Sequence, residues 1–146
     1  MIIVKIYKAL FSGIYFTKAL ELASKCKYSE SMIMLDRSDR YKGDIYSHWL
    51  LRGYLLHVNR DFDSCYEVLD TALELIQNRK SLDEDSKKYL ALYATDLLNS
   101  SIVHGGLGEE LREVDTSFVL ENVESRLKRY FPILLERKSE LGCKDV

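Results

Sequence analysis

The amino-acid sequence predicts an all-helical domain, and three features support that prediction. The chain has 146 residues, enough for one domain but too few for two of ordinary size. Hydrophobic residues make up 47% of the chain and charged residues 30%, which is the composition of a globular protein rather than a disordered one. One proline and seven glycines are too few for the many turns of a sheet-rich fold. We therefore expect a single helical domain over residues 1–146.

Charge and cysteine usage predict a cytoplasmic protein without a membrane partner. The 21 basic and 23 acidic residues give a net charge of −2, so no strong field attracts nucleic acid or an anionic membrane. Lys5, Lys8 and Lys18 interrupt the apolar N-terminal stretch, which argues against a secretory signal or a membrane span there. Three cysteines without a CxxC pair are typical of reduced thiols in the cytoplasm.

A 34-residue echo runs through the first half of the chain. Aligning the chain with itself at that shift places Ala19 over Gly53 and Leu35 over Leu69, so small residues fall on small ones and large on large ones. Close packing of helices requires such matching. The echo predicts two antiparallel helical hairpins within residues 12–77. The alternative is a small irregular helical bundle in which the echo is accidental.

The second copy of the echo carries the residues of a known repeat. The positions that fit are Trp49, Gly53, Phe62, Cys65 and Ala72. This stretch resembles the tetratricopeptide repeat, a helix–turn–helix unit of about 34 residues. The resemblance covers residues 44–77 and extends more loosely over 12–43, while Arg52 and Leu56 depart from the usual Leu and Tyr. It implies antiparallel helical hairpins stacked as a short solenoid, and we expect the last helix to cap the stack.

Gly53 has a predicted packing role in this repeat. A glycine inside a helix costs about 1 kcal/mol relative to alanine. We therefore expect a neighbouring helix to approach closely at Gly53.

Two more helices follow the repeats. A third repeat-like helix is predicted over residues 81–103, because Ser81 and Glu84 form a capping-box pattern and the glycines from Gly105 onward end a helix. A kinked C-terminal helix is predicted over residues 115–141, beginning near Thr116 and interrupted by Pro132.

Catalytic and metal-binding patterns are missing from the sequence. His48, His57 and His104 do not have the spacing of metal ligands, and no HExxH occurs. No serine or cysteine has a sequence neighbour that marks it as an activated nucleophile. We therefore predict no enzyme activity, metal, cofactor or small-molecule substrate. An enzyme would require His57, a cysteine and a carboxylate to meet in one pocket.

The resemblance also implies where a partner would bind. In tetratricopeptide repeats the first helix of each unit lines a concave groove. Carried onto this chain, the predicted partner-binding residues are Phe16, Leu20, Ser47, Leu50, Tyr54, His57, Lys88, Thr95 and Asn99. The ten tyrosines of the chain also suit a binding surface, because tyrosine combines a large contact area with a polar group. The alternative for Leu20 and Leu50 is a place in the core of a smaller bundle.

The sequence therefore favours a non-enzymatic protein that binds and masks a partner. The most specific version is an immunity protein or antitoxin that neutralises a bacterial toxin. Alternatives are a chaperone for a secreted effector, a scaffold or regulatory adaptor, and a homodimer that covers the apolar ends of a short solenoid. A nucleic-acid protein using the basic stretch around Arg126–Arg129 is less favoured, because Glu121 and Glu124 interleave with it.

Overall fold

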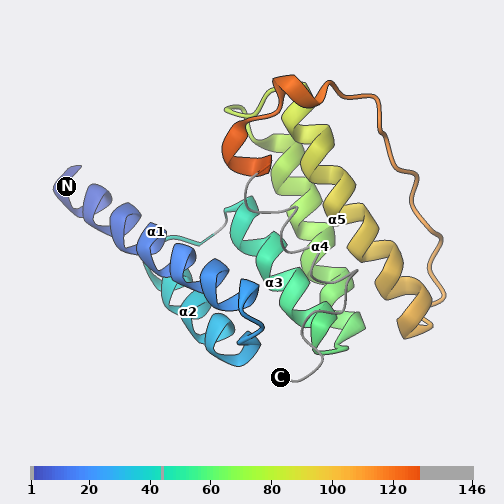
Figure 1. The fold of residues 1–146 in the computed structure, drawn as a ribbon, viewed down its shortest axis with the longest axis horizontal. Coiled ribbons are helices and arrows are strands. Elements are labelled where there is room, and N and C mark those ends of the chain that lie inside the picture. The colour runs from blue at the N-terminus through green and yellow to red at the C-terminus, as the bar shows by residue number, and fades with distance from the viewer. Residues whose placement is uncertain (1, 44, 129–146) are drawn as a thin grey trace.

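The computed structural model describes residues 2–43 and 45–128, and all regular elements in these ranges are helical. The elements are α1 (Ile2–Ser24), α2 (Tyr28–Tyr41), α3 (Tyr46–Val58), α4 (Phe62–Asn78), α5 (Glu84–Gly105) and a short 3-10 helix, η1 (Leu120–Asn122) (Figure 1). The all-helical prediction is thereby confirmed for the described part of the chain.

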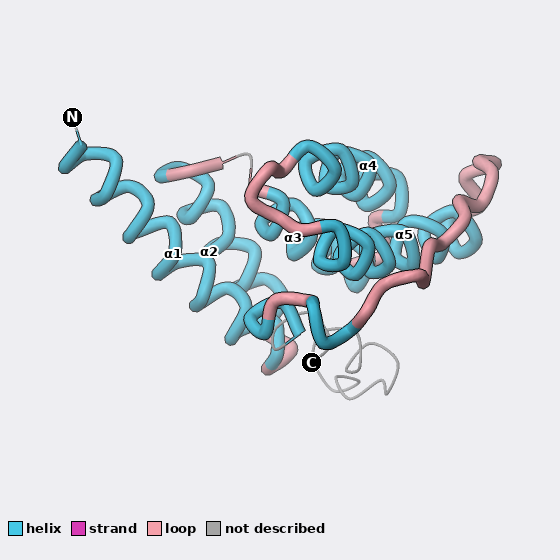
Figure 2. The backbone as a smooth tube through the Cα atoms, turned by 90° about the horizontal axis from the view of Figure 1, so that it is seen from above, coloured by secondary structure: helices cyan, strands magenta, loops and turns pink. Residues whose placement is uncertain are grey.

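The helices pack mainly against their neighbours in the sequence. α1 lies along α2, α3 lies along α4, and α4 also packs against α5 (Figures 1 and 2). Because only a few residues join the helices of each pair, the first four helices form two antiparallel hairpins. The N-terminal part of α1 extends beyond the end of α2 (Figure 1).

The two hairpins have corresponding boundaries. The first helix of each ends at Ser24 and Val58, and the second begins at Tyr28 and Phe62. The corresponding boundaries of the two hairpins therefore lie 34 residues apart, which is the interval of the sequence echo. The connecting turns also match, because Cys26 (φ 64°) and Arg60 (φ 63°) are both left-handed. The echo coincides with two helical hairpins of the same local form.

The same hydrogen bond joins the two helices of each hairpin. In the first hairpin the Ser31 hydroxyl donates to the Ala19 carbonyl at 2.6 Å. In the second, the Cys65 thiol donates to the Gly53 carbonyl at 3.2 Å. Donor and acceptor both move by the interval of the echo from one hairpin to the next. These bonds fix how each helix pair crosses.

The close approach predicted at Gly53 is present. A Cβ atom added to Gly53 would lie 2.5 Å from Cδ2 and 2.7 Å from Cγ of Leu69 on α4. Leu69 is fully buried, so its side chain has little room to move away. The prediction of a packing role for Gly53 is confirmed.

α5 begins later than predicted. Its first residue is Glu84 and its N-cap is Asp83, whose side chain makes no capping hydrogen bond. Ser81 instead accepts a hydrogen bond from Arg79 Nε at 3.0 Å, so the predicted capping box at Ser81 is wrong. The predicted stop is confirmed, because Gly106 caps the helix in the left-handed conformation (φ 58°).

The prediction of a helix from Thr116 is also wrong. Residues 109–119 form no helix; η1 follows, and helical structure resumes only at residue 125. The Asp115 carboxylate does accept a hydrogen bond from the Ser117 amide at 2.9 Å, but this closes a local turn rather than a helix N-terminus. The rest of the predicted C-terminal helix, including Pro132, lies outside the described residues.

Two further observations bear on the cellular environment. No helix among the described residues is long and apolar enough to cross a membrane. Cys65 is a buried thiol outside any disulfide, whereas Cys26 is disulfide-bonded, so the expectation of reduced thiols is wrong at Cys26. The cytoplasmic location remains a prediction.

Candidate protein-binding cleft

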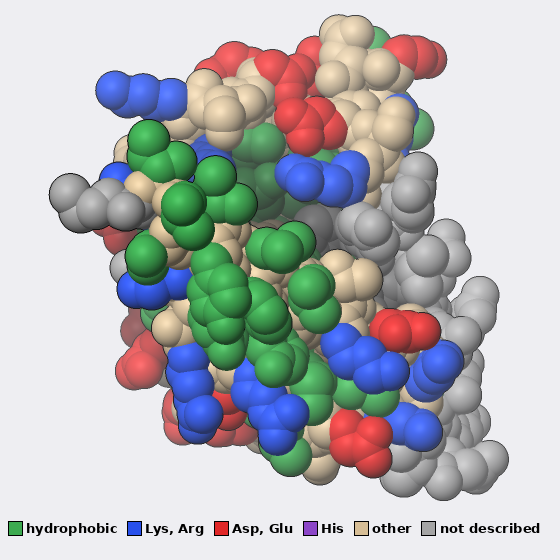
Figure 3. Space-filling view, turned by 90° about the vertical axis from the view of Figure 1, so that its left-hand side faces the viewer, with side chains coloured by type: hydrophobic (Ala, Val, Ile, Leu, Met, Phe, Trp, Pro, Cys, Tyr) green, Lys and Arg blue, Asp and Glu red, His purple; other side chains and the backbone are tan. Residues whose placement is uncertain are grey.

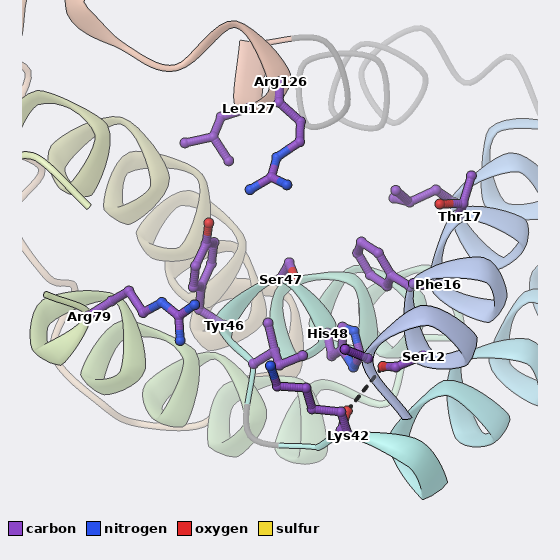
Figure 4. A pocket seen from close by; sticks show the side chains of 14 residues that line it. Ser12, Phe16, Thr17, Lys42, Tyr46, Ser47, His48, Arg79, Arg126 and Leu127 are labelled. Atoms are coloured by element: carbon purple, nitrogen blue, oxygen red, sulfur yellow. Dashed lines mark hydrogen bonds between the residues drawn. The ribbon is translucent and has the colours of Figure 1, made fainter. Parts of the chain in front are cut away.

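A cleft of about 430 Å³ separates α1 from the beginning of α3. Its walls are the stretch Ala9–Leu20 of α1, the residues that follow α2, the first turn of α3, the residue after α4, and Arg126 with Leu127. The cleft therefore lies where the two hairpins meet (Figure 4).

The floor and sides of the cleft are largely apolar. Phe16 and Tyr46 point into it from opposite sides (Figure 4). The Phe16 ring stacks on the imidazole of His48, with centroids 4.6 Å apart, so its orientation is fixed by packing. Burial raises the pKa of the Tyr46 phenol, which keeps this group neutral at ordinary pH. Leu20 and Leu127 also line the cleft, but both are core residues, 8% and 3% exposed, so Phe16 supplies most of the accessible apolar contact.

Three cations stand around this apolar surface. They are Lys42 after α2, Arg79 after α4, and Arg126, which points down into the cleft in Figure 4. No Asp or Glu lines the described part of the cleft. None of the three cations forms an ion pair with a carboxylate of the described residues. The cleft thus combines apolar contact area with three cations that form no ion pair among residues 2–43 and 45–128.

A partly buried polar network begins at the cleft wall, where Ser12 and His48 line the cleft, and holds α1, α2 and α3 together. His48 Nδ1 lies 2.7 Å from the Asp39 carboxylate, and His48 Nε2 lies 3.4 Å from the Ser38 hydroxyl. Ser38 donates to the Ser12 carbonyl at 2.7 Å. Arg52 donates to the second oxygen of Asp39 at 2.6 Å. The network therefore fixes the angle between the first hairpin and α3.

Ser38, His48 and Asp39 lie in the order of a Ser–His–Asp catalytic triad, but their geometry does not support catalysis. Ser38 is 0% exposed, so a substrate has no access to its hydroxyl group in this structure. Its one proton is directed at the Ser12 carbonyl rather than at His48. The three side chains act as a structural bridge.

The remaining histidines and acidic residues form no metal site among residues 2–43 and 45–128. No group of three or more potential ligands comes together there. His57 Nε2 lies 2.8 Å from the Ser100 hydroxyl and packs against Phe62, with ring centroids 5.4 Å apart. These contacts join α3, α4 and α5.

Five of the six predicted groove residues of the first two units divide into two groups, and His57, which lies against Ser100 of α5, belongs to neither. Phe16, Leu20 and Ser47 line the cleft together. Leu50 is only 4% exposed and Tyr54 only 2% exposed, so both are core residues rather than lining of an open groove. Leu20, at 8% exposed, is also a core residue although it borders the cleft, so the alternative of a core position is the correct one for both leucines.

The predicted groove residues of α5 are covered by the chain itself. Asn99 donates to the carbonyl and accepts from the amide of Arg112, both at 2.9 Å. Lys88 donates to the Ser117 hydroxyl at 3.3 Å, and Thr95 is buried. The segment after α5 thus occupies the face on which the third unit was expected to bind a partner.

The three cations of the cleft were not among the predicted binding residues. Lys42 and Arg79 follow the ends of helices, where the repeat pattern specifies no binding position. Arg126 was visible in the sequence only as part of a basic stretch. Tertiary folding brings these residues together, and no spacing in the sequence marks them as a group.

Comparisons of the chain with protein-family models, with curated proteins and with solved structures find no match. The fold and the cleft therefore carry the functional argument by themselves.

Proposed function

We propose that this protein is a non-enzymatic binding module and that the cleft between α1 and α3 receives a segment of a partner protein. The observation that carries the proposal is the combination of an apolar cleft with three cations that lack a carboxylate partner among the described residues. Apolar contacts supply binding energy, and charges of one sign select the partner.

The proposal includes a tetratricopeptide-like arrangement of the two hairpins. Its support is the 34-residue correspondence of helix ends, left-handed turn residues and interhelical hydrogen bonds. In such an arrangement the first helix of each hairpin lines one concave face. Phe16 on α1 and Ser47 on α3 both line the cleft, in agreement with that expectation.

The chemistry of the cleft specifies the partner segment. A matching partner segment presents at least one large apolar side chain to the space beside Phe16 and Tyr46. It also carries carboxylates that reach Arg79 and Arg126, because an Arg–carboxylate pair can form two parallel hydrogen bonds. We therefore propose an acidic, partly apolar protein segment as the ligand.

The most specific form of this function is neutralisation of a bacterial toxin. A single domain that covers part of a toxin surface inactivates it without any chemistry of its own. Co-expression of a candidate toxin with and without this protein tests the idea. Cells survive with the wild-type protein and die with the Arg126→Glu variant, whereas death in both cases would leave a chaperone or adaptor role.

Affinity capture from the source organism identifies the partner and tests the cleft. One stoichiometric protein is expected with the wild-type bait and with Arg37→Glu, whose substitution lies on the exposed surface of α2. It is expected to be lost with Phe16→Ala. Equal capture by folded Phe16→Ala protein would contradict a role for the cleft.

The cations also favour one second candidate, binding of a nucleic-acid phosphate. Titration with salt separates the two ligands, because nucleic-acid affinity falls steeply as counterions are released. The nucleic-acid candidate would be favoured if the affinity for an oligonucleotide fell steeply with salt and affinity capture recovered no partner protein.

A further inference from the structure

The N-terminal half of α1 carries a second apolar face, which the described part of the chain leaves exposed. Its side chains lie in a continuous hydrophobic patch at the end of the molecule where α1 begins (Figure 3). The residues of this face, each between 52% and 81% exposed, are Ile2, Ile3, Ile6, Tyr7, Leu10 and Ile14. Single exposed apolar residues are common on protein surfaces, but six large ones on one helix face form a contiguous patch that indicates an interaction site.

Most of this face is distinct from the one that packs on α2, although Tyr7 also contacts α2, where its ring lies 6.4 Å from the Tyr41 ring. At 3.6 residues per turn, the six residues fall on one side of the helix. The buried residues Ser12, Ala19 and Ala23, which face α2, fall on the opposite side. The C-terminal half of α1 is therefore buried on its α2 side, whereas its N-terminal half carries the exposed apolar stripe on the other side.

The exposed face has the spacing of a helix–helix seam. Ile3, Tyr7, Leu10 and Ile14 follow one another at intervals of four, three and four residues. Alternating intervals of three and four are those of the core positions in a coiled coil. Ile6 widens the seam on one side.

We propose that this face is the interface between two copies of the chain, with α1 packed against α1 of the partner copy about a two-fold axis. A two-fold interface requires a surface that complements itself, and a charge-free apolar stripe does so. With roughly 200 Å² for a fully exposed large side chain, the six residues present about 750 Å² per copy, close to the ~800 Å² per partner of a standard interface. This is the largest area that the six residues can bury, and it approaches the area of a standard interface.

The positions of the charges favour a second copy over a lipid surface. Lys5 and Lys8 fall on the side of α1 opposite the stripe, so they point away from the seam and do not repel each other across it. Lys18, nearer the stripe, is paired with Glu21 at 3.7 Å. An interfacial membrane helix instead places free cations beside its apolar face, where they reach the headgroups.

Sedimentation equilibrium over a range of protein concentrations tests the proposal. The wild-type protein is expected to be a dimer. Leu10→Glu places a charge from each copy in the seam and raises the dissociation constant by roughly 100-fold or more. Ile6→Glu is expected to have the same effect. Val103→Glu is the matched control, because Val103 is 62% exposed, similar to Leu10 at 58%, but lies on α5.

Any other outcome with folded proteins contradicts the proposal. Circular dichroism first establishes that the variants are folded, as expected for substitutions at exposed positions. A wild-type protein that stays monomeric at its highest soluble concentration, or a Leu10→Glu dimer of unchanged affinity, contradicts the α1 interface. A monomer that cosediments with phosphatidylglycerol vesicles, and loses this binding in Leu10→Glu, would assign the face to a bilayer.

Discussion

Gly53 shows how a single residue sets the distance between two helices. Because Gly53 has no side chain, Leu69 of α4 can pack directly against α3 at this point. A Cβ atom added to Gly53 would lie only 2.5 Å from Leu69 Cδ2. Gly53→Ala is therefore expected to lower the free energy of unfolding by about 1–3 kcal/mol, the usual cost of overpacking a filled core. Chemical denaturation followed by circular dichroism measures the change.

Gly13→Ala is the control for this prediction, because nothing lies within 4 Å of its added Cβ. The same substitution on α1 is expected to raise the free energy of unfolding by up to about 1 kcal/mol through helix propensity alone. Two alanine variants with equal effects would show that propensity, and not packing, explains the change at Gly53.

Asp39 makes stability depend on pH. Burial raises the pKa of Asp39, but hydrogen bonds from His48 and Arg52 outweigh burial and hold that pKa below its usual range. The unfolded chain has the ordinary pKa of about 3.9. The folded carboxylate therefore contributes stability above that pH, and the contribution is lost as pH falls through the lower, folded pKa.

Asp39→Asn is expected to destabilise the protein at neutral pH by about 1–3 kcal/mol, because hydrogen bonds to charged groups are lost. It is also expected to reduce the loss of stability below pH 4. Denaturation curves from pH 3 to pH 7 measure both effects. An acid response identical to wild type would contradict the role of Asp39, and Asp96→Asn, on the exposed surface of α5, serves as the control.

At the scale of elements, the equivalence of the two hairpins predicts that a serine can replace Cys65. Cys65 and Ser31 occupy equivalent positions, and each donates to the carbonyl of the first helix in its hairpin. Cys65→Ser should therefore change the free energy of unfolding by less than about 1 kcal/mol, because a hydroxyl can make the same bond. Cys65→Val keeps the volume but removes the donor and is expected to cost more. A larger loss for Ser than for Val would argue against equivalence.

The elements that could be predicted from the sequence are those governed by helix packing. Small and large residues at a 34-residue shift identified the region of the two hairpins, and glycine chemistry identified the end of α5 at Gly106. The start of α5 and the segment after it were mispredicted for a physical reason. Ser81 has Arg79 as its partner, and the segment after α5 is held by Asn99 and by other contacts that are distant in the sequence.

The candidate site was predictable only in part, for a related reason. Repeat positions identified Phe16, Leu20 and Ser47, which line the cleft. They did not distinguish these from Tyr54, which is 2% exposed and whose ring packs against Tyr28 of α2. They also gave no indication of Arg79, because its contribution depends on where the end of α4 lies relative to α1.

At the scale of the whole molecule, α1 serves two surfaces. Phe16 on its C-terminal half lines the cleft, and Leu10 on its N-terminal half lies on the exposed apolar stripe. We expect the two surfaces to be separable. Leu10→Glu should dissociate the dimer without abolishing partner binding, while Arg126→Glu should leave the dimer intact.

The affinity of the captured partner for charge-reversed protein tests the central claim most directly. Calorimetric titration of that partner into wild type, Arg126→Glu and Arg37→Glu compares one cation of the cleft with one outside it. The cleft model predicts that Arg126→Glu weakens binding by roughly 10-fold to 100-fold, as expected when an ion pair becomes a repulsion. It predicts no change for Arg37→Glu. Equal affinities for all three proteins would contradict the assignment of the cleft as the binding site.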